Sequence, residues 1–236
     1  MKQFVVTSLG ELEQICQHGY HPLFRGVSDA EFPLIPRVGR LSQHAAEERQ
    51  LLKLFKRLAE PYLQRVPSND WEWLSIAQHH GLPTRLMDWT KNPFVAAFFA
   101  VRQPEVQTDS AIWVLEPANT IIADVVGRGL GVPLTDIWAV DETICASPFD
   151  ITEVGVYLPR HISPRIQAQG ALFTVHPKPS KALKSPSLAK IVLPQTSRAR
   201  LRQALRDLDF HDAKLFPDLD GQAAYVTAKF AEEMFY

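Results

Sequence analysis

Hydrophobic positions recur at helical spacing in several segments of the chain. Between residues 42 and 64, five apolar or aromatic side chains recur every three or four positions with charged residues between them: Leu51, Leu54, Phe55, Leu58 and Tyr62. This period predicts an amphipathic helix. Asn69-Asp70 predicts the start of a second helix that ends near His80, before Gly81. Asn92-Pro93 predicts the start of a third, which carries the apolar run to Val101.

Short apolar runs bounded by turn residues predict strands at residues 4–6, 22–26, 110–115, 171–176 and 189–193. Further helices are expected at 9–17, 197–208 and 222–235, and an extended segment at 33–36. Glycine and proline interrupt residues 116–159, which carry no clear pattern. Because no repeat and no long linker is visible, the prediction is one mixed α+β domain over residues 1–236, with helices packed on small twisted sheets.

The composition restricts the classes of partner. Of 236 residues, 46% are hydrophobic, which supplies a full core, and 25 basic against 26 acidic residues leave a net charge of −1. Wrapping of a long nucleic acid by bulk charge is therefore excluded, whereas a local basic groove is not. The longest apolar run, residues 94–101, is too short to span a bilayer, and the N-terminus has no signal-peptide pattern.

The two cysteines, Cys16 and Cys145, have no paired spacing, so neither a disulfide framework nor a zinc site is indicated. We expect a cytoplasmic protein with no membrane partner. The sequence does not define its oligomeric state.

The first candidate site is Phe24-Arg25-Gly26. Arginine at the end of a short apolar strand presents a rigid fork of donors to a phosphate or a carboxylate. Gly26 allows a ligand or a second backbone to approach closely. The alternative is that Arg25 simply pairs with a surface acid.

The second candidate site is the polar run from Gln78 to Pro93, between two apolar helices. Its side chains able to bind a ligand or take part in chemistry are Gln78, His79, Arg85, Asp88, Thr90 and Asn92. So many hydrogen-bonding groups favour a site over a plain connector, although Asp88 could merely neutralise Arg85. His79-His80 has no second ligand pair at helical spacing, so no metal is expected.

The third candidate site is residues 165–173, where Arg165, Gln167 and Gln169 are the candidate ligand-binding side chains. In an extended segment Gln167 and Gln169 would share one face, and an ordinary exposed strand face is the alternative interpretation. No GxGxxG, P-loop, GxSxG or HExxH pattern occurs. Rossmann dinucleotide binding, P-loop phosphoryl transfer, nucleophile-elbow hydrolysis and helical zinc proteolysis therefore lose their main support.

At these clusters the chain resembles the FRG domain family, which is named for a Phe/Tyr-Arg-Gly signature. The resemblance rests on Phe24-Arg25-Gly26 and on the long stretch from Gln78 to Ala100, with weaker similarity at residues 165–173 and 216–221. It covers a core of about residues 20–221. Such domains look like components of bacterial mobile-element and defence loci, so the resemblance implies a role in defence or in a toxin system.

A more distant similarity is to ADP-ribosyltransferases of the Arg-Ser-Glu type, and it implies an ADP-ribosyltransferase-like fold. Their three elements would correspond to Arg25, to Asp88-Trp89-Thr90 leading into the apolar helix, and to Gln167-Ala168-Gln169. The similarity implies that Arg25 binds the pyrophosphate of NAD and that Thr90 orients the nicotinamide ribose. Gln169 stands where these enzymes have a glutamate, and a neutral amide supplies no negative charge to an oxocarbenium-like transition state. Asp88 is the nearest substitute.

Three functions are therefore open. The leading one is binding of NAD or a related nucleotide as substrate, with ADP-ribosyl transfer to a protein or nucleic-acid target or with NAD cleavage. The second is a metal-dependent nuclease or other hydrolase that uses His79, Arg85 and Asp88. The third is a non-catalytic nucleotide-sensing or interaction module. Under the first, we expect Arg25, His79, Arg85, Asp88, Thr90 and Gln169 to converge on one pocket.

Overall fold

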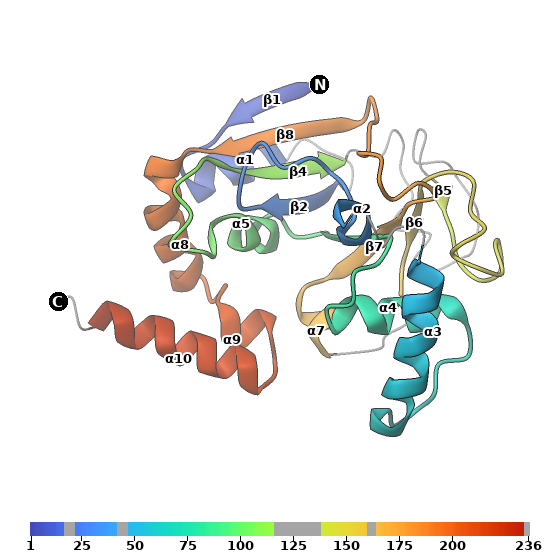
Figure 1. Ribbon diagram of the computed structural model, residues 1–236. Helices are drawn as coiled ribbons and strands as arrows, with labels where there is room; N and C mark the ends of the chain where they lie inside the picture. Colours follow the sequence, from blue (N-terminus) through green and yellow to red (C-terminus); the bar gives the residue numbers. More distant parts are fainter. Residues whose placement is uncertain (17–21, 42–46, 116–137, 160–163, 234–236) are drawn as a thin grey trace.

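One mixed β-sheet runs through the molecule (Figure 1). The computed structural model describes residues 1–16, 22–41, 47–115, 138–159 and 164–233. The strands are β1 (Lys2–Val5), β2 (Leu23–Val27), β3 (Leu86–Thr90), β4 (Ser110–Leu115), β5 (Trp138–Ala139), β6 (Gly155–Tyr157), β7 (Ala171–Val175) and β8 (Leu188–Leu193). Their order is β1-β8-β4-β2-β3-β7-β6-β5. The α+β class is thus confirmed, but within the described segments the expected small sheets form one eight-stranded sheet.

The helices are α1 (Leu9–Cys16), α2 (Arg37–Arg40), α3 (Glu48–Ala59), α4 (Asp70–His79), α5 (Pro93–Val101), α7 (Pro164–Ala168), α8 (Arg198–Asp207), α9 (Asp212–Leu215) and α10 (Leu219–Glu233). Two 3-10 turns, η1 (Glu60–Tyr62) and η2 (Gln195–Ser197), extend α3 and precede α8. No helix in the described part of the chain is long and apolar enough to cross a membrane.

Helix α5 is the centre of the largest core cluster. Val95, Ala96 and Ala100 are buried against β2 and β4, and α1 and α8 cover the helix from outside. The expected cap is confirmed, because the Asn92 side chain accepts a hydrogen bond from the Phe94 amide at 2.9 Å. The all-round apolar sequence of α5 therefore reflects burial on most sides.

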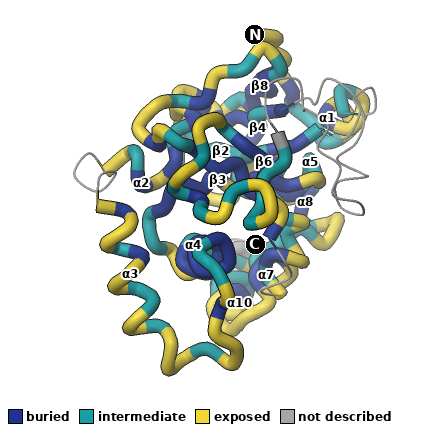
Figure 2. The backbone as a smooth tube through the Cα atoms, turned by 90° about the vertical axis from the view of Figure 1, so that its right-hand side faces the viewer, coloured by how far each residue is buried: buried dark blue, intermediate teal, exposed yellow. Residues whose placement is uncertain are grey.

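Helices α3 and α4 form a second layer with β6 and β7 (Figure 1). Trp71 and Leu74 of α4 are fully buried beside Tyr157 and Phe173, and Figure 2 shows α4 buried along most of its length. The side chain of Asn69 caps α4 by accepting from the Glu72 amide, as the sequence predicts. Helix α3 keeps an exposed outer face. The expected apolar stripe is only partly buried, because Leu54, Leu58 and Tyr62 are exposed.

Local structure differs from the sequence prediction in three places. No strand is expected in the polar run from Gln78 to Pro93, yet this run contains the central strand β3. Residues 164–168 form helix α7 rather than an extended segment, and the turn at Gly170 follows it. Part of the long helix expected over 42–64 lies outside the described residues, and the rest is α3 followed by η1.

The sheet opens between its two central strands. Strand β2 pairs with β4 over all five of its residues, but it pairs with β3 only at Phe24 with Thr90. Beyond that position β3 continues its ladder with β7. The two halves of the sheet therefore separate after Phe24, and Arg25 and Asp88 stand on the strands that line the opening.

Candidate functional site

A cleft of about 1060 Å³ lies at this opening. It is lined by β2, β3, α2, the end of α4, the outer part of α5, α7 and the start of α10. Eight of the candidate residues line it: Arg25, Gly26, Gln78, His79, Asp88, Thr90, Arg165 and Gln169. Arg85, Asn92 and Gln167 do not. A cleft of this size can hold a ligand as large as a dinucleotide.

Arg25 closes the gap where the strand ladder ends. Its Nη1 donates to the backbone oxygen of Asp88 at 2.8 Å and lies 3.6 Å from Asp88 Oδ2. The side chain is 19% exposed, and no other hydrogen bond joins it to a described residue. Burial lowers the pKa of the Arg25 guanidinium, Asp88 opposes this shift, and Arg40 adds to it. The guanidinium is thus anchored by one nitrogen and retains donors for a ligand.

The carboxylate of Asp88 is oriented by a chain of side chains. Asp88 Oδ2 accepts from Gln78 Nε2 at 2.9 Å, and Gln78 Oε1 accepts from the Thr84 hydroxyl at 2.7 Å. Asp88 itself is 53% exposed to the cleft. Gln78, at the end of α4, therefore positions the carboxylate that β3 presents to a ligand.

The two histidines lie at the end of α4, with their rings edge to face at 4.8 Å between centroids. Burial lowers the pKa of His79 to about 4, and the charges of His80 and Arg165 add to this shift. His79 is consequently neutral at neutral pH and can exchange hydrogen bonds with an uncharged group of a ligand.

Thr90 and Asn92 are engaged by the fold itself. The Thr90 hydroxyl donates to the backbone oxygen of Gln169 at 2.7 Å and accepts from the Asn92 amide at 3.1 Å. Asn92 is the cap of α5. Thr90 therefore links β3 to the residue after α7. Its hydroxyl proton is used in this hydrogen bond and is not free to bind a ligand.

Gln169 is also held by a protein partner. Its side-chain Nε2 donates to the backbone oxygen of Leu215 at 2.9 Å. Gly170 follows at φ 54°, a left-handed conformation that favours glycine. Gln167 is exposed on α7 and lies outside the cleft. Gln167 and Gln169 therefore do not form a shared face on a strand, because the backbone there is a helix end and a turn.

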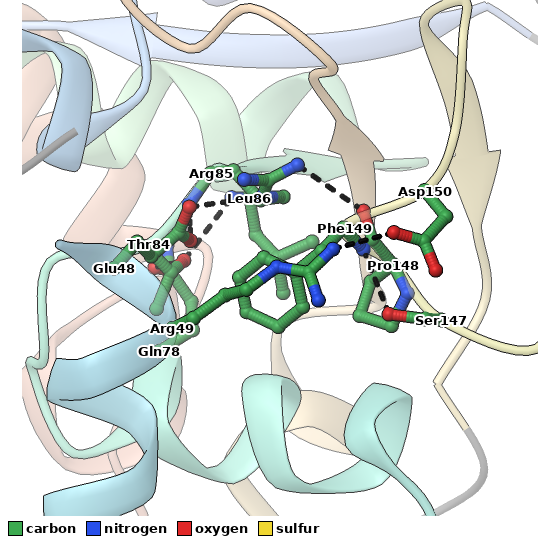
Figure 3. A network of polar contacts seen from close by, with 10 residues as sticks. All are labelled: Glu48, Arg49, Gln78, Thr84, Arg85, Leu86, Ser147, Pro148, Phe149 and Asp150. Atoms are coloured by element: carbon green, nitrogen blue, oxygen red, sulfur yellow. Dashed lines mark hydrogen bonds and ion pairs between the residues drawn. The ribbon is translucent and has the colours of Figure 1, made fainter. Parts of the chain in front are cut away.

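Arg85 does not join the cleft and does not pair with Asp88. It is buried on the opposite side of β3, where its Nε donates to Glu48 Oε2 at 2.9 Å and its Nη1 donates to the oxygen of Pro148 at 3.3 Å (Figure 3). Its guanidinium lies over the ring of Phe149, 4.5 Å from the centroid. This network joins α3, β3 and the 147–150 loop, so Arg85 stabilises the fold.

Gly26 allows a second backbone to approach closely. A Cβ at this position would lie 1.9 Å from the Ala96 oxygen and 2.7 Å from the Ala100 nitrogen, both in α5. Glycine is therefore what allows α5 to pack directly on β2. Of the two roles expected from the sequence, close approach of a second backbone is the one that the geometry shows.

The segment that carries Arg25, Gln78 and Asp88 also matches a known family. Residues 21–109 match the FRG domain. This chain therefore contains an FRG domain. The matched range holds β2, α2, α4, β3 and α5, which form most of the cleft. No curated protein and no solved structure matches the chain.

Several cleft residues of this FRG domain protein were not singled out from the sequence. Arg37 and Arg40 come from α2, Arg102 from the residue after α5, and Asp218 and Asp220 from the start of α10. The pair Arg37 and Arg40 sits three apart after a proline, which could have marked a short helix with both cations near one face. The remaining residues come from distant segments and share no local pattern.

Outside the matched range, the cleft is completed by α7 and by the start of α10, and α9 lies beside them. Arg102 and Arg165 both lie over the ring of Phe216, at 4.4 Å and 4.3 Å from its centroid, and Arg102 also pairs with Asp212. Among the described residues no group of three or more histidine, cysteine, aspartate or glutamate side chains could hold a metal ion.

Proposed function

We propose that the cleft binds NAD or a related nucleotide and cleaves its N-glycosidic bond, with transfer of the ADP-ribosyl group to an acceptor or to water. The observation that carries this proposal is the pairing of Arg25 and Asp88 across the opening between β2 and β3. Arg25 retains donors for a phosphate, and Asp88 presents an oriented carboxylate to the same cleft.

Asp88 takes the role of the missing glutamate in this proposal. Gln169 brings a neutral amide that is already bonded to Leu215. Asp88 is held by Gln78 and remains half exposed, so its negative charge can face the ribose. As the bond between C1′ and the nicotinamide nitrogen breaks, its electron pair leaves with the nicotinamide and positive charge develops on the ribose. A fixed carboxylate stabilises that charge in a partly desolvated cleft.

The other cleft groups have supporting roles. The nucleophile, either water or an acceptor hydroxyl, adds to C1′ and releases its proton to the solvent. His79 is neutral at neutral pH and lies in the same cleft, so it can accept a hydrogen bond from that nucleophile. The aromatic side chains Phe99 and Phe173 line the cleft and offer apolar surface to a base.

The test is incubation of the purified chain with NAD, with and without EDTA, followed by mass spectrometry of the nucleotide and of the protein. Wild type should release nicotinamide in both conditions. Asp88→Asn should lower the rate by about 100-fold or more, because it removes the charge and keeps the shape. Arg25→Lys should weaken binding nearly as much as Arg25→Ala, since lysine lacks the planar fork.

A matched control is Asp207→Asn, an exposed position on α8 that does not line the cleft. It should keep the wild-type rate. Activity that disappears with EDTA and acts on nucleic acid instead of NAD would favour the hydrolase and refute this proposal. NAD binding without turnover would identify a sensing module, and it would also refute the cleavage step.

A further inference from the structure

Positive charge collects on the side of the cleft formed by β2 and α2. Five arginines and three aspartates line the whole cleft. Asp218 and Asp88 both act electrostatically on Arg165 and His79, and Asp88 also acts on Arg25. Helix α2 supplies two arginines to the cleft lining, Arg37 and Arg40, and contains no acidic residue.

The backbone of α2 is fixed in place, so its arginines project from a rigid base. Val38 is fully buried, and its amide donates to the Thr84 oxygen at 3.3 Å. A Cβ on Gly39 would lie 1.8 Å from the Pro179 oxygen, so the helix packs directly on that loop. Arg37 is further held, because its Nη1 donates to the Gly81 oxygen at 2.9 Å.

Arg40 is the cation of α2 that is left for a ligand. It is exposed, lines the cleft, and makes no hydrogen bond or ion pair to any residue in the described segments. It also acts on Arg25, since its charge contributes to the lowered pKa of that guanidinium. Two guanidinium groups from different elements thus repel each other across one cleft, and a bound anion would relieve this repulsion.

We infer that Arg25 and Arg40 form a diphosphate subsite, which lets the cleft distinguish nucleoside diphosphates from nucleoside monophosphates. One guanidinium binds one phosphate through two parallel hydrogen bonds. Two guanidiniums on separate fixed elements therefore match two linked phosphates better than one. The inference rests on the proposed function only in taking the ligand to be a nucleotide.

The test compares binding of ADP, AMP and inorganic pyrophosphate to the full chain by isothermal titration calorimetry. Wild type should bind ADP at least about tenfold more tightly than AMP, because the second phosphate gains a charge-assisted contact. Arg40→Gln should reduce this preference to about threefold or less while AMP binding stays close to wild type. Pyrophosphate binding should weaken in parallel.

Arg57→Gln is the matched control, since Arg57 is exposed on α3 and does not line the cleft. It should keep the preference for ADP, and circular dichroism should show that both variants are folded. Equal affinities for ADP and AMP in wild type, an unchanged preference in Arg40→Gln, or binding of none of the three probes would overturn the subsite.

The outcomes also separate this inference from the proposed function. A preference for ADP that depends on Arg40, without consumption of NAD, would support the subsite and refute NAD cleavage. Consumption of NAD with equal affinity for ADP and AMP would refute the subsite alone.

Discussion

Replacement of Gly26 by alanine measures how closely α5 packs on β2. The added methyl would lie 1.9 Å from the Ala96 oxygen and 2.7 Å from the Ala100 nitrogen. Both are backbone atoms of α5, so no rotation of a side chain relieves the overlap, and the helix itself has to move. Overpacking of a core by one or more methylenes costs about 1–3 kcal/mol. A clash with backbone belongs at the upper end, so Gly26→Ala should lower the free energy of unfolding by about 3 kcal/mol or more.

Urea denaturation followed by circular dichroism measures this loss, and the melting temperature should fall by about 6–12 °C for a chain of this size. Gly10→Ala is the control, because no atom lies within 4 Å of a Cβ there and the residue is in α1. It should raise stability by up to about 1 kcal/mol, as alanine favours a helix. Truncation of the neighbouring side chain, Ala96→Gly, should not rescue Gly26→Ala. A Gly26→Ala variant within about 0.5 kcal/mol of wild type would refute this account of the glycine.

Three further predictions concern stability and use the same denaturation assay. Asn92→Ala removes the acceptor for the Phe94 amide and should cost about 1 kcal/mol. Glu48→Gln leaves the buried Arg85 guanidinium without its carboxylate and should cost about 3–5 kcal/mol. His176 is buried, and burial, with Arg25 and Arg85 nearby, lowers its pKa to about 3. Its unfolded pKa is about 6.5, so its contribution is complete above pH 6.5 and should be lost between there and pH 3, by up to about 1.4 kcal/mol per pH unit.

Each of these three has a control. Asn92→Asp keeps an acceptor and should stay near wild type, and a loss equal to that of Asn92→Ala would argue against the cap. The control for Glu48→Gln is Asp150→Asn, which breaks the exposed ion pair between Arg49 and Asp150. This substitution should lower the free energy of unfolding by less than about 1 kcal/mol. In His176→Asn, the free energy of unfolding should fall less steeply between pH 6.5 and pH 3 than in wild type. An equally steep fall would show that other groups cause the loss of stability.

The sequence predicts the helices of this fold better than its central strand. The starts of α4 and α5 follow from Asn69 and Asn92. Their side chains accept hydrogen bonds from amides in the first turn, as capping requires. Strand β3 is only five residues long, carries Asp88 in its middle, and lies between turn residues. Its identity comes from pairing with β7, which no local pattern encodes.

For the site, the sequence identified Arg25, Gln78, His79 and Asp88, which line one cleft. It missed that Arg85 belongs to a buried pair. In the sequence, Glu48 is one of the polar positions of an amphipathic helix. In the structure it is buried, because it pairs with Arg85 next to β3. Charge pairs between distant segments leave no signal in either segment alone, and the same applies to Arg40 beside Arg25.

The pairing of β1 with β8 has a consequence for synthesis of the chain. Lys2 is aligned with Ala189 and Val5 with Val192, in a parallel ladder. Strand β1 therefore has no partner in the sheet until nearly two hundred further residues have been synthesised. Contacts of such sequence separation form late in folding. Until then, the exposed edge of β1 is open to pairing with other chains, so a chaperone that shields β1 would raise the yield of folded protein.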